Sequence, residues 1–118
     1  MMAHQTAERY DAMKEYIAVA QISEVPPGRM KWVALDGQRV VLANVDGTVY
    51  ALKDMCGHQR VPLSRGRLEG HIVECPKHFA RFDVRNGKYL GGPPSADVPV
   101  FDVRVIGETV FVRAPDTD

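Results

Sequence analysis

The stretch that decides the fold begins with Cys56-Gly57-His58 and ends, after sixteen further residues, with Cys75-Pro76-Lys77-His78. It contains both cysteines of the chain and two of its four histidines. A Cys and a His separated by one or two residues can project from one tight loop toward a common centre. A second loop of the same kind doubles the set. We therefore expect the rest of the chain to be a scaffold that brings the two loops together.

Three kinds of site compete for these four side chains. A single tetrahedral zinc ion accepts two sulfurs and two nitrogens, but zinc sites usually pair Cys with Cys and His with His, with two or more residues between the paired ligands. Buried cysteines with unrelated histidines are disfavoured, because four ligand-type residues fall into two pairs. The third is a two-iron, two-sulfide cluster, with each loop giving its Cys to one iron and its His to the other.

The two loops and their flanks resemble one known motif. Cys56-x-His58 followed by Cys75-Pro76-x-His78 is similar to the Rieske motif, and the neighbouring residues agree with it, namely Pro62-Leu63-Ser64-x-Gly66-x-Leu68-x-Gly70 and Phe82-Asp83-x-x-x-Gly87. The resemblance covers the chain from about Tyr16 to Val112. It is closest to the small Rieske ferredoxins that serve bacterial oxygenases.

This resemblance implies one [2Fe-2S] cluster and a ligand set for it. Cys56 and Cys75 would bind the buried iron, and His58 and His78 would bind the outer iron through one ring nitrogen each. The segment Gly91-Gly92-Pro93-Pro94 is similar to the proline loop that covers the cluster from a third side in this family.

The chain also departs from the family pattern. Phe79 follows the second histidine, where glycine is usual, and a ring there would lie beside His78. Respiratory Rieske proteins carry an extra cysteine in each loop and join the two by a disulfide. This chain has Val61 and Lys77 at those places, so the resemblance implies no disulfide.

Two hydroxyl groups of the respiratory proteins are missing as well. The positions two and four residues after His78 hold Ala80 and Phe82 instead of Ser and Tyr. Hydroxyl bonds to sulfur stabilise the reduced, more negative cluster and raise its potential. We therefore expect a potential near the low end of the Rieske range, about −150 mV.

The remaining sequence reads as an all-β protein. Asp36-Gly37, Asp46-Gly47 and Asn86-Gly87 are typical of tight hairpin turns. They separate short apolar segments, which predicts an antiparallel sandwich or small barrel. The expected strands are 16–22, 31–35, 39–45, 48–52, 67–69, 72–74, 81–84, 100–106 and 109–113.

The strands shorten between Leu52 and Arg81, which predicts a small cluster-binding subdomain over about 53–83, inserted into a single domain of residues 16–118. Residues 1–15 form an N-terminal extension. Residues 6–16, which begin in this extension, have the apolar spacing of a short helix, or of a segment that is helical only when docked.

Three other side chains receive structural predictions. Trp32 stands at an alternating position of a strand and is expected in the core. Ser64 would either bond backbone in the first loop or be a plain turn residue. His71, at the Gly70 turn, is expected to be a solvated turn histidine rather than a ligand.

Charge and composition narrow the function. The 118 residues have a formal net charge of zero, which argues against a bulk electrostatic hold on nucleic acid or on an anionic membrane. The apolar runs are strand-sized, and the first residues do not read as a secretory signal. The expected location is the cytoplasm, where two cysteines are ligands or free thiols more often than a disulfide.

The resemblance implies an electron carrier rather than an enzyme. The protein would take single electrons from an NAD(P)H-dependent flavoprotein reductase and pass them to the terminal oxygenase of a dioxygenase system, through transient contacts. Basic residues around the two loops would favour acidic partner surfaces or would simply be solvated, and these are Arg60, Arg65, Arg67, Lys77 and Arg81.

Three alternatives stay open. The carrier would serve a di-iron monooxygenase, or it would be the small subunit of a complex similar to nitrite reductase. In a different class, the chain would be a zinc-stabilised structural module.

Overall fold

The computed structural model of the protein describes residues 15–57 and 60–114. These residues form ten strands and two short 3-10 helices, namely β1 (Ile17–Gln21), η1 (Ile22–Glu24), β2 (Met30–Leu35), β3 (Gln38–Val45), β4 (Thr48–Lys53), η2 (Leu63–Arg65), β5 (Arg67–Glu69), β6 (Ile72–Glu74), β7 (Arg81–Asp83), β8 (Tyr89–Gly91), β9 (Val100–Ile106) and β10 (Thr109–Arg113).

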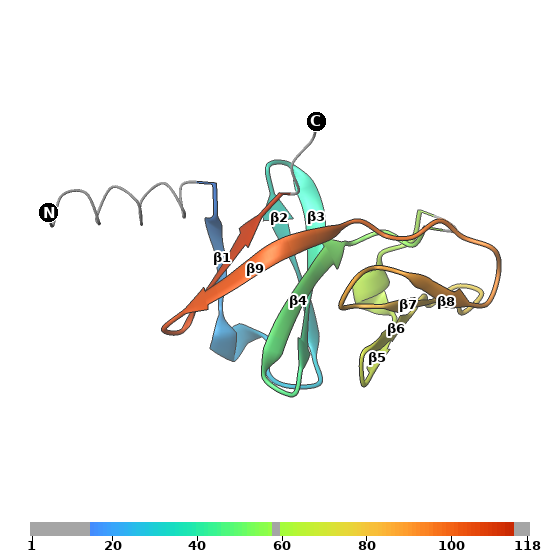
Figure 1. The fold of residues 1–118 in the computed structure, drawn as a ribbon, viewed down its shortest axis with the longest axis horizontal. Helices are drawn as coiled ribbons and strands as arrows, with labels where there is room; N and C mark the ends of the chain where they lie inside the picture. Colours follow the sequence, from blue (N-terminus) through green and yellow to red (C-terminus); the bar gives the residue numbers. More distant parts are fainter. Residues whose placement is uncertain (1–14, 58–59, 115–118) are drawn as a thin grey trace, which may run out of the picture.

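The strands make two antiparallel sheets, which Figure 1 shows as a larger and a smaller lobe. The larger sheet has the order β1-β10-β9-β4-β3-β2, and its two edge strands lie next to each other, so that it curls into a barrel-like base. The smaller sheet has the order β5-β6-β7-β8. The chain enters the small lobe after β4 and returns to the base at β9. The predicted all-β fold, with a small lobe inserted into a β base, is confirmed.

The Asp-Gly pairs make the hairpins that the sequence predicts. Asp36 and Gly37 have φ values of 49° and 80°, and Asp46 and Gly47 have values of 52° and 96°. Both residues of a type I′ turn need positive φ, which Asp tolerates and Gly adopts freely. These turns set the registers of β2 with β3 and of β3 with β4.

Strand β3 separates two apolar cores. Side chains of a strand alternate between faces, so Val41, Ala43 and Val45 point one way and Val40 and Leu42 the other. The first set packs with both cysteines and with the buried residues of the small lobe. The second set packs inside the base against Val110, Val112 and Phe101. Both sides of β3 are therefore buried, and the small lobe covers an outer face of the base.

Asn44 is the polar exception in β3. It is 1% exposed, and its amide nitrogen donates to the carbonyl oxygen of Val25 at 2.8 Å. Its side-chain oxygen accepts from the backbone N–H of Gly47 at 2.8 Å. A buried amide costs free energy unless it is bonded, and these two contacts satisfy it while they anchor the turn and the β1–β2 connection.

Two sequence predictions need correction. Trp32 is 47% exposed and lies under the guanidinium of Arg39, whose central carbon is 3.9 Å from the ring centroid, so it is a surface residue and not a core one. Strand β8 was not predicted, since it ends in glycine and runs directly into the Gly91-Gly92-Pro93-Pro94 segment. The predicted helix over 6–16 lies almost entirely outside the described residues. Within the described residues, no helix is long and apolar enough to cross a membrane.

The two-core arrangement predicts the effect of truncating Leu52, which is fully buried on the side that faces the small lobe. Leu52→Ala should lower the free energy of unfolding by about 2–5 kcal/mol, because it removes buried methyl groups and leaves a cavity. Denaturant unfolding measures the change. Ile106→Ala, at a side chain 54% exposed, is the control and should change stability by less than about 0.5 kcal/mol. Equal effects of the two substitutions would contradict the packing described here.

Candidate functional site

The first Cys/His loop follows β4 and is closed by its own backbone. The N–H of Cys56 donates to the carbonyl oxygen of Val61 at 2.8 Å. Before it, the N–H of Lys53 donates to the oxygen of Pro99, and the N–H of Asp54 donates to the oxygen of Arg39. The start of the loop is thereby tied to two different parts of the base.

The carboxylate of Asp54, just before the first loop, bonds Ser64, just after it, and so holds the two ends of the loop together. The Asp54 side chain is fully buried and accepts the N–H of Ser64 at 2.7 Å and the hydroxyl of Ser64 at 2.7 Å. Arg39 contacts the same carboxylate through Nε and a terminal nitrogen, both at 3.1 Å. Charge-assisted bonds of this kind are about twice as strong as neutral ones. Ser64 was predicted to bond backbone or to be a plain turn residue, and the structure shows instead that its hydroxyl bonds this carboxylate.

The second loop joins β6 to β7 and is equally tight. The N–H of Cys75 donates to the carbonyl oxygen of Ala80 at 2.8 Å. Between them, His78 and Phe79 have φ values of 67° and 61°. Two successive left-handed residues reverse the chain and place both side chains at the exposed end of the small lobe, while Cys75 and Ala80 are fully buried.

The loop between β8 and β9 covers both Cys/His loops. A Cβ on Gly57 would lie 2.3 Å from the carbonyl oxygen of Ala96, and a Cβ on Gly92 would lie 2.9 Å from the oxygen of Phe79. The hydroxyl of Tyr89 donates to the carbonyl oxygen of Gly92. Only glycine allows approaches this close. Three segments that are distant in sequence thus meet at one end of the molecule.

The two thiols lie together at this meeting point. Cys56 is 3% exposed and Cys75 is 0% exposed, and both are free cysteines. Burial raises the pKa of the Cys75 thiol to about 11; the N–H of Lys77 bonds this thiol and opposes the rise, and the neighbouring Cys56 side chain adds to it. A pair of buried, adjacent thiols binds a metal centre well, because a bound metal removes the proton that burial alone would retain.

The histidines are placed only in part. His78 is exposed at the loop end, and His58 lies outside the described residues. Among the described residues, no group of three or more His, Cys, Asp or Glu side chains surrounds a single point. A two-iron cluster does not need such a group, since each iron takes two protein ligands and shares sulfides with the other. The buried thiols and an imidazole at the surface fit that donor set.

His71 is exposed in the turn between β5 and β6, as predicted for a turn histidine. Its electrostatic neighbour is Asp83. Asp83 lies close enough for His71 to lower the pKa of its carboxyl slightly. The main cause of that lowered pKa is Arg85, whose guanidinium donates to both carboxylate oxygens at 3.1 and 2.9 Å. The same contact raises the pKa of Arg85. This ion pair shapes the β7–β8 hairpin and not the cysteine site.

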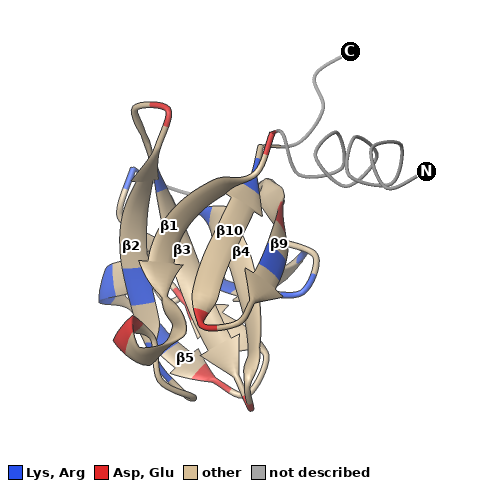
Figure 2. Ribbon diagram, turned by 90° about the vertical axis from the view of Figure 1, so that its left-hand side faces the viewer, with Lys and Arg blue, Asp and Glu red and all other residues tan. Residues whose placement is uncertain are grey.

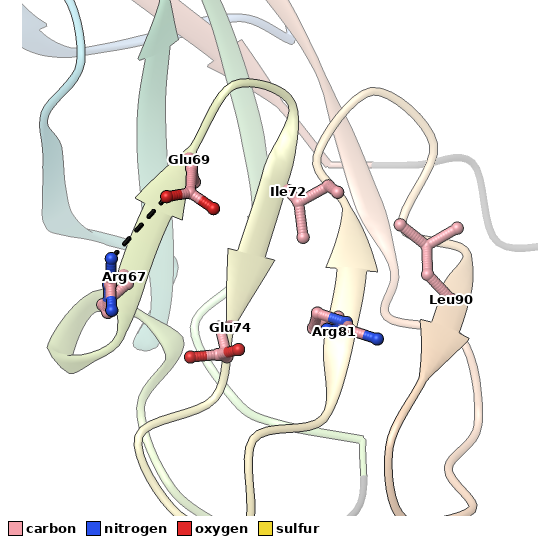
Figure 3. Close-up of a pocket in the computed structure, with 6 residues that line it drawn as sticks. All are labelled: Arg67, Glu69, Ile72, Glu74, Arg81 and Leu90. Atoms are coloured by element: carbon pink, nitrogen blue, oxygen red, sulfur yellow. Dashed lines mark ion pairs between the residues drawn. The ribbon is translucent and has the colours of Figure 1, made fainter.

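The basic residues near the loops do not form one uniform ring. Arg67 and Arg81 line a hollow of about 290 Å³ on the outer face of the small sheet, with Glu69, Glu74, Ile72 and Leu90 (Figure 3). Arg67 pairs with Glu69 at 3.6 Å. Arg65 lines a separate open groove with Lys31, Trp32 and Arg39. Figure 2 shows the basic positions, in blue, spread over several elements rather than gathered at one place. Of the five, Lys77 alone belongs to the second Cys/His loop.

Three parts of this site were not predicted from the sequence. The contact of Gly57 with Ala96 joins residues that are distant along the chain. Asp54 and the bond from Tyr89 to Gly92 belong to no sequence motif. The spacing of Asp54, two residues before Cys56, was the one available signal.

The fold and the paired loops define a two-lobed all-β protein with a thiol pair in the smaller lobe. Comparison with known proteins assigns a family to this arrangement. The family model described as Rieske [2Fe-2S] domain matches residues 15–102. The chain is 39% identical over 98 residues to the biphenyl dioxygenase ferredoxin subunit of Pseudomonas sp. (strain KKS102), covering 82% of this chain and 90% of that protein.

Other relatives point the same way. The ferredoxin component of the naphthalene 1,2-dioxygenase system of Pseudomonas aeruginosa is 32% identical over 99 residues, which cover 84% of this chain and 95% of that one. The solved structure of the ferredoxin of carbazole 1,9a-dioxygenase from Nocardioides aromaticivorans IC177 superposes with a TM-score of 0.81 at 30% identity, covering 85% of this chain and 98% of that chain.

The chain belongs to the Rieske [2Fe-2S] domain family. Its cofactor is accordingly a Rieske-type [2Fe-2S] cluster.

The clamp on the first loop predicts a measurable loss when Asp54 is removed. Asp54→Ala leaves the N–H of Ser64 without its acceptor in a partly buried place, which costs about 1–3 kcal/mol of folding stability. Ser64→Ala removes only the hydroxyl bond and should cost about 1 kcal/mol. Denaturant unfolding of both variants and of the double variant measures the coupling. Full additivity of the two losses would argue against a shared clamp.

Proposed function

We propose that this protein is an electron carrier and not an enzyme, passing single electrons from an NAD(P)H-dependent flavoprotein reductase to a terminal oxygenase. One observation carries the proposal. Two buried thiols lie together under a covering loop, with an exposed histidine beside them, in a member of the Rieske family. Such a site can hold a redox cluster close to the surface.

The ligand set is also a proposal. Cys56 and Cys75 would hold the inner iron, and His58 and His78 would hold the outer iron. When bound, the cluster supplies a reversible one-electron couple. The chain's own residues provide its surroundings, since Gly57 and Gly92 let the covering loop close over the thiols and exclude water. The exposure of His78 leaves a short path from this site to a partner. Residues 16–118 would act as one Rieske domain.

The partners are inferred from the relatives. Those compared above are named as ferredoxin parts of biphenyl and naphthalene dioxygenase systems. A solved structure titled as a complex of reduced oxygenase and oxidized ferredoxin in carbazole 1,9a-dioxygenase contains a chain that superposes on this one with a TM-score of 0.81 at 29% identity. By this similarity the carrier would serve an aromatic-ring dioxygenase and would work in the cytoplasm. Both contacts would be brief, because each turnover requires release.

The surroundings of the thiols support a low potential. Ala80 and Phe82 are both fully buried next to the second loop, and neither side chain can donate a hydrogen bond to sulfur. The ring of Phe82 packs edge-on against Tyr89, with centroids 6.2 Å apart. The midpoint potential should then lie near the low end of the Rieske range, about −150 mV, which suits transfer from a flavin to an oxygenase.

The proposed ligand set predicts opposite outcomes for two exposed histidines. His78→Ala should lose the visible absorption and most of the iron, because one ligand position on the outer iron is vacated. His71→Ala is the matched control in the same lobe and should retain both. Iron and acid-labile sulfide assays together with visible spectroscopy measure the outcome. A colourless wild-type protein that contains zinc would support the structural-module alternative instead.

Reconstitution tests the carrier function. The protein, reduced through an NADH-dependent flavoprotein reductase, should support turnover by the oxygenase component of the biphenyl system of strain KKS102 or of the naphthalene system of Pseudomonas aeruginosa. The product should be lost when this chain is omitted. Potentiometry on the same preparation should give a midpoint near the low value stated above, and a strongly positive midpoint would contradict it. Turnover only with a di-iron monooxygenase or a nitrite reductase would select the corresponding alternative.

A further inference from the structure

The side chain of Phe79 is unusually placed for a large apolar residue. It is 62% exposed, while Cys75 and Ala80 in the same loop are fully buried. It is also the most exposed of the large apolar side chains in the described part of the chain. Single exposed apolar side chains are common on protein surfaces. Phe79 differs from the others in that it directly follows His78.

The backbone of Phe79 is costly as well. Its φ of 61° follows a φ of 67° at His78, and side chains other than Gly, Asn and Asp seldom occupy this region. Glycine would adopt the same conformation without that cost. Strain of this kind persists where the surrounding structure imposes it, and it is concentrated at functional sites.

The loop does not need the ring in order to hold its shape. The bond from the N–H of Cys75 to the oxygen of Ala80 closes the turn, and the backbone of Gly92 packs on the backbone of Phe79 and Ala80. Among the described residues, no ring–ring or cation–π contact involves Phe79. The ring therefore contributes apolar surface and little internal packing.

The charged residues next to Phe79 in its own loop and at the start of β7 are basic. Between Glu74 and Asp83, the only charged residues are Lys77 and Arg81. The covering loop that packs on Phe79 has one charged residue, Asp97, and its carboxylate accepts the N–H of Tyr89 at 2.9 Å. A complementary surface would present an apolar socket with carboxylates at its edge.

We propose that Phe79 is the apolar anchor by which this protein docks on its terminal oxygenase, in a socket bordered by acidic residues. The inference rests on the proposed carrier function and adds the residue that determines partner binding. The position next to His78 puts the anchor beside the proposed electron exit, so that docking and a short transfer distance are achieved together. Exposed aromatic rings that enter a partner's pocket often dominate binding energy.

A docking role and a structural role of Phe79 predict different effects of substitution on stability. Phe79→Gly relieves the left-handed strain and removes the anchor, so the folded protein should lose no stability while binding weakens. Phe79→Leu keeps an apolar side chain in the same strained backbone and should retain part of the binding. Ile106→Ala removes a comparably exposed apolar group from the β9–β10 end of the base and is the matched control.

The experiment uses the holoprotein and the oxygenase that accepts electrons from the wild type in the reconstitution assay. We expect Phe79→Gly to raise the KM for the carrier about tenfold or more, with an unfolding midpoint in denaturant equal to or above that of wild type. Its cluster content, midpoint potential and rate of oxidation by ferricyanide, a small oxidant without a docking site, should be unchanged. Ile106→Ala should leave every value at the wild-type level.

Salt separates the ring from the charges. The loss caused by Phe79→Gly should be the same at low and high ionic strength, whereas the loss caused by Lys77→Glu should shrink as salt screens the charge. A Phe79→Gly protein that transfers electrons at the wild-type KM overturns the proposal. So does one that unfolds more easily or changes its potential, because the ring would then be structural. Failure of the wild type to reduce any oxygenase would instead refute the carrier function on which the proposal depends.

Discussion

Strand β3 packs apolar side chains on both of its faces, and the rest of the structure depends on this double burial. Val40 and Leu42 close the barrel-like base, and Val41, Ala43 and Val45 support the small lobe together with Leu52 and both cysteines. The thiol site is thus built directly on the outer face of the base. A lobe with strands of only three residues has too little core of its own, and it borrows rigidity from this shared face.

The three loops at the tip depend on one another in the same way. Asp54 holds the first loop through Ser64 and Arg39, the Cys75–Ala80 bond closes the second, and the covering loop fits both only because Gly57 and Gly92 have no side chain. The result is a pair of thiols shielded from water beside a histidine at the surface. A one-electron carrier needs this combination, since the cluster must be protected and also lie close to a partner.

Phe79 is the exception in this arrangement, because its large apolar side chain is exposed. Phe82, which follows in β7, is buried and its ring packs against Tyr89. Phe79 occupies a strained backbone and faces solvent. Retaining such a residue at the exposed end is reasonable if a partner covers it during transfer, and this links the local backbone geometry to the choice of partner.

The sequence by itself determined the fold class, the hairpins and the family, because these depend on local signals. Asp36-Gly37 and Asp46-Gly47 require positive φ wherever they occur, and the spacing of Cys56 and Cys75 within their loops is a short-range property. Tertiary structure alone decided what depends on residues far apart in the chain. Trp32 lies at the surface under Arg39, and Ser64 bonds a carboxylate. Strand β8 joins the small sheet, and Ala96 packs against Gly57. No local pattern encodes these contacts, because each arises from the way the small lobe packs on the base.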